Sequence, residues 1–368
     1  MNRIFASINS VFILFLVSIS FFACNDNKKE NTETTSDSTA VVEESKEVNV
    51  YSHRHYESDK NLFAEFEKQT GIKVNVVKAS ADELINKLEM EGQNSPADVL
   101  ITVDAGRLHR AKSKELLQPI ESETLFTNIP AHLRDADNQW FGITKRARVI
   151  VYDKKIEKAE NIKTYESLAN KDFSNTGKDG NGKILIRSSG NVYNQSLLAS
   201  IIAHNGEKGA KIWASNIVHS MARTPKGGDR DQIKAIAAGE GTIGVVNTYY
   251  LAQMLNDTDE ENVKAAQKVA VIFPNQDGRG THINVSGAAV TKYAPNKENA
   301  IKLIEFLTSK EAQEVYVREE MEYPVRTDVE MAQTLKDWGT FKEDTLSLSK
   351  LGENQEKAVI IFDEVGWK

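Results

Sequence analysis

From residue 47 onward, short apolar segments typical of buried strands alternate with segments whose apolar residues recur at helical spacing. This alternation restricts the fold more than any other feature, because consecutive strands must then be joined by crossover connections. Crossovers of this kind give a largely parallel sheet with helices on its faces. The sequence therefore predicts an α/β protein. In the first part of the chain we expect strands at 47–51, 72–77 and 97–102, with a helix after each of them.

One segment, 140–152, is long for a single strand. Within it, Arg146 and Arg148 are two residues apart, so both side chains point to one face of the strand. We interpret the segment as a strand that passes between two lobes. We then expect strands at 183–188, 243–246 and 269–273, helices at 192–204, 207–221 and 231–238, a return crossing at 280–290, and helices at 297–307 and 311–321. The first lobe is predicted to comprise residues 47–145 and 286–368, and the second lobe residues 146–285.

The N-terminal residues have the pattern of an exported protein. Arg3 precedes an apolar run at 11–22, which has the length of a signal-peptide core and is too short for an ordinary membrane span. The run ends before Cys24, and this end resembles the lipobox of bacterial lipoproteins, with Phe21 where leucine is usual. We predict a signal peptide at 1–23, a lipid anchor on Cys24 and a polar, disordered tether at 24–46. A plain secretory signal with an incidental cysteine is the alternative.

Charge and cysteine content exclude several classes of protein. The formal charge of the whole chain is -7, and loss of residues 1–23 removes only the positive charge of Arg3, which gives -8. A mildly acidic surface argues against general nucleic-acid binding. Because Cys24 is the only cysteine, the exported domain has no internal disulfide and depends on packing for its stability. The sequence contains no glycine-rich phosphate loop, zinc-ligand spacing or nucleophile elbow.

Tyrosines follow three of the expected strands. Tyr249 and Tyr250 come directly after one strand, and Tyr56 and Tyr193 follow two others. Ligands of open α/β sheets bind beyond the carboxyl ends of the strands, so we expect these phenols to face one centre. Phenolate is a hard anionic donor with an ordinary pKa of about 10, so a strongly polarising cation is needed to bind several, and ferric iron suits this best. Taken singly, each tyrosine would instead pack its ring and donate one hydrogen bond.

Five motifs are found along the chain, and three of them include these tyrosines. The five are Tyr51-Ser-x-Arg-His-Tyr56, Ala97-Asp-Val-x-x-Thr102 with Asp104, Lys145-Arg-Ala-Arg-Val-Ile-Val-Tyr152, Gly190-Asn-x-Tyr-Asn-Gln195 and Asn247-Thr-Tyr-Tyr250. As a set, they resemble the motifs of the ferric-iron-binding members of the periplasmic solute-binding proteins of bacterial ABC importers, and the resemblance covers nearly all of residues 48–326. It implies a two-lobed periplasmic binding protein of type II, in which each lobe is a mixed sheet flanked by helices and crossing strands join the lobes. It also implies a monomer, lipid-anchored in the periplasm, that binds ferric iron between the lobes and delivers it to an ABC transporter permease.

The family's iron site consists of a His-Tyr pair on the first lobe and three tyrosines on the second. Some members use fewer tyrosines, a glutamate and a bound anion such as phosphate or carbonate, and the resemblance here favours the tyrosine-rich type. Four phenolates on ferric iron leave one excess negative charge, which Arg146 or Arg148 would offset. If one phenol does not coordinate the iron, either arginine would instead hold a carbonate. Ordinary ion pairing on a strand face is the other interpretation of these arginines. Carried over by motif, the ligands are His55, Tyr56, Tyr193, Tyr249 and Tyr250.

Two other functions compete with iron binding. The same fold would suit an importer component for an organic or oxyanion solute, such as a polyamine, thiamine or sulfate, with tyrosines stacked on the solute and Arg146 or Arg148 on its anionic part. An enzyme would use His55 and nearby acids for acid–base chemistry, but no motif pairs a nucleophile with a base, so we expect no enzyme. The remaining histidines are expected to be structural or surface groups: His53, His109, His132, His204, His219 and His282.

Overall fold

The computed structural model describes residues 45–156, 159–170 and 183–368. The predicted signal peptide, Cys24 and the predicted tether up to residue 44 lie outside the described residues. Among the described helices, none has both the length and the apolar character needed to cross a lipid bilayer.

The predicted strands of the first lobe form one sheet with the order β2-β1-β3-β8-β4. β1 pairs in parallel with β2 and β3, whereas β8 runs antiparallel to β3 and β4. The alternation of strands and helices therefore produces the expected parallel core, and β8 closes it on one side. The strands are β1 (Glu47–Ser52), β2 (Lys73–Lys78), β3 (Val99–Thr102), β4 (Phe141–Asp153) and β8 (Ile283–Val290).

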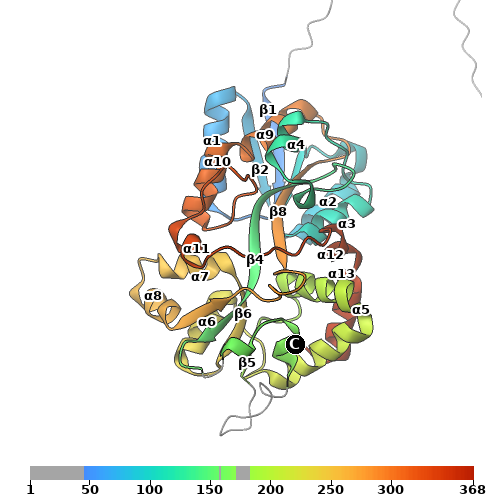
Figure 1. Cartoon of the computed structure of the whole chain (residues 1–368). Coiled ribbons are helices and arrows are strands. Elements are labelled where there is room, and N and C mark those ends of the chain that lie inside the picture. Colours follow the sequence, from blue (N-terminus) through green and yellow to red (C-terminus); the bar gives the residue numbers. More distant parts are fainter. Residues whose placement is uncertain (1–44, 157–158, 171–182) are drawn as a thin grey trace, which may run out of the picture. The chain divides into compact units, whose positions relative to one another are not determined.

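The long strand β4 belongs to two sheets. Its first half, up to Ala147, pairs with β8, and its second half, from Arg148, pairs with β6 (Ile243–Asn247) and β7 (Val269–Ile272). β5 (Ile184–Leu185) pairs in parallel with β6 and completes the second sheet. The prediction of a strand that passes between lobes is therefore confirmed, and Figure 1 shows β4 as the long central strand with β8 beside part of it.

Helices cover both sheets. Those that follow the first-lobe strands are α1 (Glu57–Thr70), α2 (Ala81–Glu91), α3 (Ala105–Ser113), α4 (Glu123–Asn128), α9 (Lys297–Leu307) and α10 (Lys310–Val315), which continues as a π-helical turn, Tyr316–Glu320. Those around the second sheet are α5 (Val192–Ser220), α6 (Asp229–Ala238), α7 (Thr248–Leu255) and α8 (Glu260–Gln267). The C-terminal segment adds α11 (Gln333–Asp337), α12 (Ser349–Glu353) and α13 (Gln355–Glu364).

The C-terminal helix α13 packs against α5. Ile361, Phe362 and Trp367 belong to the same buried apolar cluster as Trp213 and Leu198 of α5. This segment falls within the predicted first-lobe range 286–368, yet its apolar side chains extend the core around α5. Burial of such large side chains contributes about 1.5–3 kcal/mol each, so α13 stabilises the second sheet as well as ending the chain.

Candidate functional site

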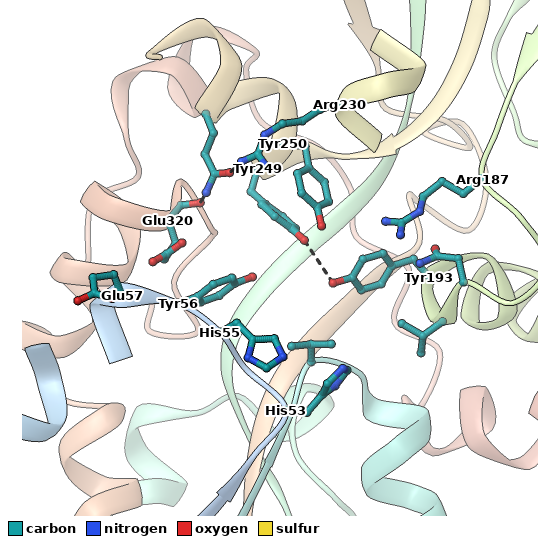
Figure 2. Close-up of a pocket in the computed structure, with 14 residues that line it drawn as sticks. His53, His55, Tyr56, Glu57, Arg187, Tyr193, Arg230, Tyr249, Tyr250 and Glu320 are labelled. Atoms are coloured by element: carbon teal, nitrogen blue, oxygen red, sulfur yellow. Dashed lines mark hydrogen bonds between the residues drawn. The ribbon is translucent and has the colours of Figure 1, made fainter. Parts of the chain in front are cut away.

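The predicted ligands His55, Tyr56, Tyr193, Tyr249 and Tyr250 line one cavity of about 580 Å³. Each comes from a point where a strand or loop enters a helix. His55 and Tyr56 lie between β1 and α1, Tyr193 is in the first turn of α5, and the tandem tyrosines are in the first turn of α7. Figure 2 shows the phenol groups converging from different elements. The tyrosines expected to face one centre thus line the same cavity.

The three second-sheet tyrosines form a contiguous group. The hydroxyl oxygens of Tyr193 and Tyr249 are 3.2 Å apart and share a hydrogen bond. The ring of Tyr249 lies against that of Tyr250, with centroids 4.1 Å apart. Tyr193 and Tyr249 are buried, although their hydroxyl groups face one another at the cavity. Two phenol oxygens at this separation can bind the same metal ion after small movements of their side chains.

Tyr56 approaches from the other side and is held by a buried carboxylate. Its hydroxyl donates to Glu322 Oε1 at 3.2 Å, and Glu322 is fully buried. The guanidinium carbon of Arg54 lies 4.5 Å from the centroid of the Tyr56 ring, a cation–π contact. Nε of Arg146 lies 3.3 Å from Glu322 Oε1. The phenol of Tyr56 thus lies within a network of compensating charges.

Burial raises the pKa of the phenols in the cavity. For Tyr193 burial raises the pKa to about 12, and Arg146 partly opposes the shift. Burial followed by the charge of Glu322 raises the pKa of Tyr56. Burial followed by the neighbouring Tyr193 and Tyr56 raises the pKa of Tyr249. These groups are therefore protonated at neutral pH unless a strongly polarising cation displaces their protons.

The two candidate arginines lie behind the cavity wall. Arg146 is 1 % exposed and donates to the carbonyl oxygen of Val103 and, at 2.5 Å, to Ser286 Oγ, in addition to its ion pair with Glu322. Arg148 is 2 % exposed and its Nη1 lies 2.6 Å from Asp229 Oδ2. Each guanidinium therefore forms an ion pair with a buried carboxylate.

Two other arginines line the cavity and were not predicted. Arg187 follows β5, and its guanidinium carbon lies 5.9 Å from the centroid of Tyr193. Arg230 lies in the first turn of α6, and its guanidinium carbon lies 5.1 Å from the centroid of Tyr250. Arg187 had a detectable signal, because it falls in an expected strand that ends at the site. Arg230 had no such signal, because it precedes an expected helix and does not lie in or directly after an expected strand.

His53 also lines the cavity, although we expected it to be a structural or surface group. Its ring makes an edge contact with His55, with centroids 6.2 Å apart. Burial, followed by the neighbouring His55, lowers the pKa of His53. A neutral imidazole at this position adds a second nitrogen donor to the first-sheet wall of the cavity.

Acidic groups complete the lining. Glu57 and Glu320 lie at the first-sheet side of the cavity. Nε2 of Gln253, on α7, donates to the backbone carbonyl oxygen of Glu320 at 3.0 Å, which joins the two sides. Within the described residues, no group of three or more His, Cys, Asp and Glu side chains is arranged to hold a metal ion.

Residues 52–314 match the family of bacterial extracellular solute-binding proteins. The chain belongs to this family of solute-binding proteins. The "Iron uptake protein A1" of Synechocystis sp. is 44 % identical over 367 residues, which covers 100 % of this chain and 98 % of that protein. Among curated relatives of this solute-binding protein there are also proteins named for ferric iron binding, such as that of Serratia marcescens, at 26 % identity over 86 % of this chain and 89 % of the relative.

Solved structures of two relatives resemble this solute-binding protein throughout the described fold. The Trichodesmium protein (IdiA, FutA) in complex with iron and citrate is 49 % identical, with a TM-score of 0.81 over 88 % of this chain and 100 % of that one. The ferric binding protein from Campylobacter jejuni is 47 % identical, with a TM-score of 0.81 over 87 % of this chain and 100 % of that one. The predicted two-lobed type II fold of a periplasmic binding protein is confirmed.

Proposed function

We propose that this solute-binding protein takes up ferric iron in the tyrosine-lined cavity and delivers it to an ABC transporter permease for import. The proposed ligands are His55, Tyr56, Tyr193, Tyr249 and Tyr250. The observation that supports this most directly is the 3.2 Å separation of the Tyr193 and Tyr249 hydroxyl oxygens, with Tyr250 packed beside them. The relatives named for iron uptake and ferric binding support it as well.

The donor set is suited to a hard trivalent ion. Phenolate oxygens favour ferric iron, whereas softer divalent ions prefer imidazole and thiolate. Binding displaces phenol protons, so the site takes up iron less well as the pH falls. His55 would coordinate the iron as a neutral imidazole, through the lone pair of one ring nitrogen. The ligands come from both sheets, so iron would draw the two lobes together.

A bound anion is proposed as a second component of the site. Carbonate is one candidate, and Arg146 or Arg148 were the predicted holders. Arg187 and Arg230 are better placed, because they line the cavity, whereas the charges of Arg146 and Arg148 are already paired with buried carboxylates. The Trichodesmium relative holds citrate with its iron, which supports an oxyanion at a corresponding position.

We further propose that residues 1–23 are a signal peptide and that Cys24 is lipidated, so that the protein works as a monomer tethered to a bacterial membrane in the periplasm. The family of extracellular solute-binding proteins supports an exported location. The proposed lobes are residues 47–145 with 286–368 and residues 146–285. Like other solute-binding proteins, it would have no enzymatic activity and no nucleic-acid partner.

The function is tested by the visible spectrum of the purified protein. Mixing the iron-free protein with ferric citrate should produce a phenolate-to-iron charge-transfer band that saturates at one iron per chain. Tyr249→Phe and Tyr250→Phe should each weaken and shift this band, because one of the phenol oxygens that bind the metal is gone. Tyr293→Phe is the matched control, because Tyr293 is exposed and does not line the cavity. A colourless wild-type protein would refute the assignment.

An organic or oxyanion solute is the second candidate. The cavity volume of about 580 Å³ exceeds the space that a bare ion needs, and two arginines line it. Calorimetry separates the two functions. Metal-free protein that binds sulfate, thiamine or a polyamine with micromolar affinity, and ferric citrate not at all, would favour this candidate.

A further inference from the structure

Arg148 lies where the segments that carry Tyr193 and the pair Tyr249 and Tyr250 converge. It is 2 % exposed and is not among the described residues that line the cavity. We propose that Arg148, held by Asp229, is a positioning residue that fixes the relative geometry of the three second-lobe tyrosines. This inference rests on the proposed function, because it concerns the ligands of the same site.

The two ends of the Arg148 guanidinium contact two different segments. Nη2 donates to Asn194 Oδ1 at 2.9 Å, and Asn194 is adjacent to Tyr193. Nη1 donates to Asn247 Oδ1 at 3.2 Å, two residues before Tyr249. A guanidinium is planar and its donors keep fixed positions. Arg148 therefore sets the distance between the first turn of α5 and the first turn of α7.

Asp229 completes the arrangement from a third element, α6. Its Oδ2 accepts a hydrogen bond from Arg148 Nη1 at 2.6 Å and another from the backbone N–H of Asn247 at 2.7 Å. Asp229 is 1 % exposed, and a buried carboxylate at this distance holds the guanidinium in one orientation. The same carboxylate thus fixes both Arg148 and the backbone that enters α7.

The start of α7 supports the same role. Asn247 is the N-cap residue of α7, but its side chain makes no capping hydrogen bond among the described residues. Asparagine at this position ordinarily accepts from an amide in the first helical turn. Here its oxygen accepts from Arg148 instead. Asn194 also donates to the carbonyl oxygen of Arg187 at 2.7 Å, which fastens α5 to the segment before it.

The geometry that depends on these contacts is narrow. The hydroxyl oxygens of Tyr193 and Tyr249 are 3.2 Å apart although the residues are separated by 56 positions in the chain. Metal–ligand distances tolerate only about 0.2 Å of variation. If α5 and α7 moved relative to each other, both helices could stay folded, but the two phenol oxygens would no longer be placed to bind the same metal ion. Arg148 is a buried side chain that contacts both helix starts.

The test compares Arg148→Lys with Arg134→Lys in the mature chain. Lysine keeps a charge opposite Asp229 but has no planar fork to hold both asparagines. We expect the dissociation constant for ferric iron, supplied as ferric citrate, to rise about 10- to 100-fold. We also expect the phenolate-to-iron band to shift and broaden. Arg134 packs on the ring of Phe126 in the first lobe, so its replacement should leave both quantities unchanged.

Asn194 provides a second pair of variants, which decides the matter if Arg148→Lys does not fold. Asn194→Ala removes the oxygen that accepts from Arg148 Nη2 and should reproduce the weaker binding and the shifted band. Asn194→Asp keeps an oxygen for Arg148 but loses the amide group that donates to the carbonyl oxygens of Arg187 and Ser188, so it should restore only part of the wild-type band. Far-ultraviolet circular dichroism confirms that each variant is folded before iron is added.

The outcomes distinguish this inference from the proposed function. A wild-type band and affinity in both Arg148→Lys and Asn194→Ala would overturn the inference. The inference would also be overturned if Arg134→Lys lost as much affinity for iron as Arg148→Lys and the band were unchanged in every variant. Arg148 would then only stabilise the fold in a general way. A wild-type protein without any band would overturn the proposed function instead. In that case the inference can still be tested without iron, by near-ultraviolet circular dichroism, which reports tyrosine packing. The spectrum should change in Arg148→Lys and stay the same in Arg134→Lys, and an unchanged Arg148→Lys spectrum would overturn the inference.

Discussion

At the scale of single residues, the buried phenols around the cavity are neutral, whereas the buried guanidinium groups are charged and paired with carboxylates. Burial raises the pKa of Tyr193 to about 12, which keeps its proton in place until a metal arrives. The arginines keep their charge, but Arg148 already neutralises Asp229. Arg187 lies 3.6 Å from the other oxygen of the same carboxylate. Two guanidinium groups share one carboxylate, so Arg187 brings an uncompensated positive charge to the cavity wall.

Arg187→Gln should therefore weaken ferric iron binding. We expect about a tenfold rise in the dissociation constant, about 1.4 kcal/mol, because the excess negative charge of several phenolates loses a counter-charge at the cavity wall. Arg187→Lys keeps the charge and should recover most of the affinity. Competition with citrate, followed by absorbance, measures both values. Equal affinities for the Gln and Lys variants would show that the charge of Arg187 has no part in binding.

A second residue-scale prediction concerns His282. Burial, followed by the charges of Arg148 and Arg279, lowers the pKa of His282 to about 3. The unfolded chain binds this proton near pH 6.5, whereas the folded protein does not until about pH 3, so stability falls as the pH drops below 6.5. The loss from this residue between pH 7 and pH 5 is about 2 kcal/mol.

The measurement is urea unfolding at pH 7 and pH 5. His282→Gln should lose less stability between these pH values than the wild type, by about the 2 kcal/mol expected from the linkage. His219→Gln is the control, because His219 is exposed on α5 and its replacement should leave the pH dependence unaltered. A His282→Gln profile parallel to that of the wild type would mean that His282 is protonated in the folded protein.

The phenols could be predicted from the sequence, and their charged partners could not. Tyr249 follows an apolar strand directly, and the ends of such strands meet at one edge of the sheet. The ion-pair partners Glu322 and Asp229 lie far along the chain from Arg146 and Arg148. Only the packing of distant segments selects such partners, and no local pattern encodes it. The sequence therefore predicts arginines near the site but does not show which carboxylates pair with them.

At the scale of elements, the pairing of β4 with β8 holds the molecule together where the two sheets meet. Gly142 and Gly287 face each other across these strands. A β-carbon on Gly287 would lie 2.6 Å from Leu108 Cδ1 and 2.8 Å from the carbonyl oxygen of Phe141. Strands β4 and β8 and helix α3 therefore approach one another so closely that position 287 requires glycine.

Gly287→Ala should destabilise the protein by about 1–3 kcal/mol, because the added methyl group overpacks the contact with the Phe141 backbone. Gly278→Ala is the matched control: its β-carbon would meet only the carbonyl oxygen of Asn275 at 3.7 Å, an ordinary contact. Chemical unfolding monitored by tryptophan fluorescence gives both free energies. A Gly287→Ala variant as stable as Gly278→Ala would show that β4 and β8 can separate without cost.

Element types were easier to predict than element ends. The two helices expected at 192–204 and 207–221 are confirmed, because α5 is interrupted at Gly206, where φ is 69° and ψ is 167°. The expected strand 183–188 pairs only over Ile184–Leu185, because Asn194 takes the carbonyl oxygens of Arg187 and Ser188. A side chain from the next helix thus ends the strand early, which strand propensity does not reveal.

At the scale of the whole molecule, the cavity wall is shared between the two sheets. His55 and Tyr56 follow β1 in the first, while the other proposed ligands begin α5 and α7 around the second. Direct polar contacts also cross between them: Ser196 Oγ donates to Asp104 Oδ2 at 2.5 Å, and Gln253 reaches the carbonyl oxygen of Glu320. A metal bound by both walls would add bonds far stronger than these contacts, so it would set the equilibrium between open and closed arrangements.

The double variant His55→Ala/Tyr56→Phe separates iron binding from closure. Three tyrosines remain, so a weaker phenolate band should persist, but nothing on the first-sheet wall reaches the metal. Small-angle scattering should show an iron-dependent decrease in the radius of gyration for the wild type and none for the variant. Tyr249→Phe/Tyr250→Phe should lose both the band and the decrease. Full compaction of the His55→Ala/Tyr56→Phe variant with iron would mean that contacts such as Gln253 with Glu320, and not the metal, close the two lobes.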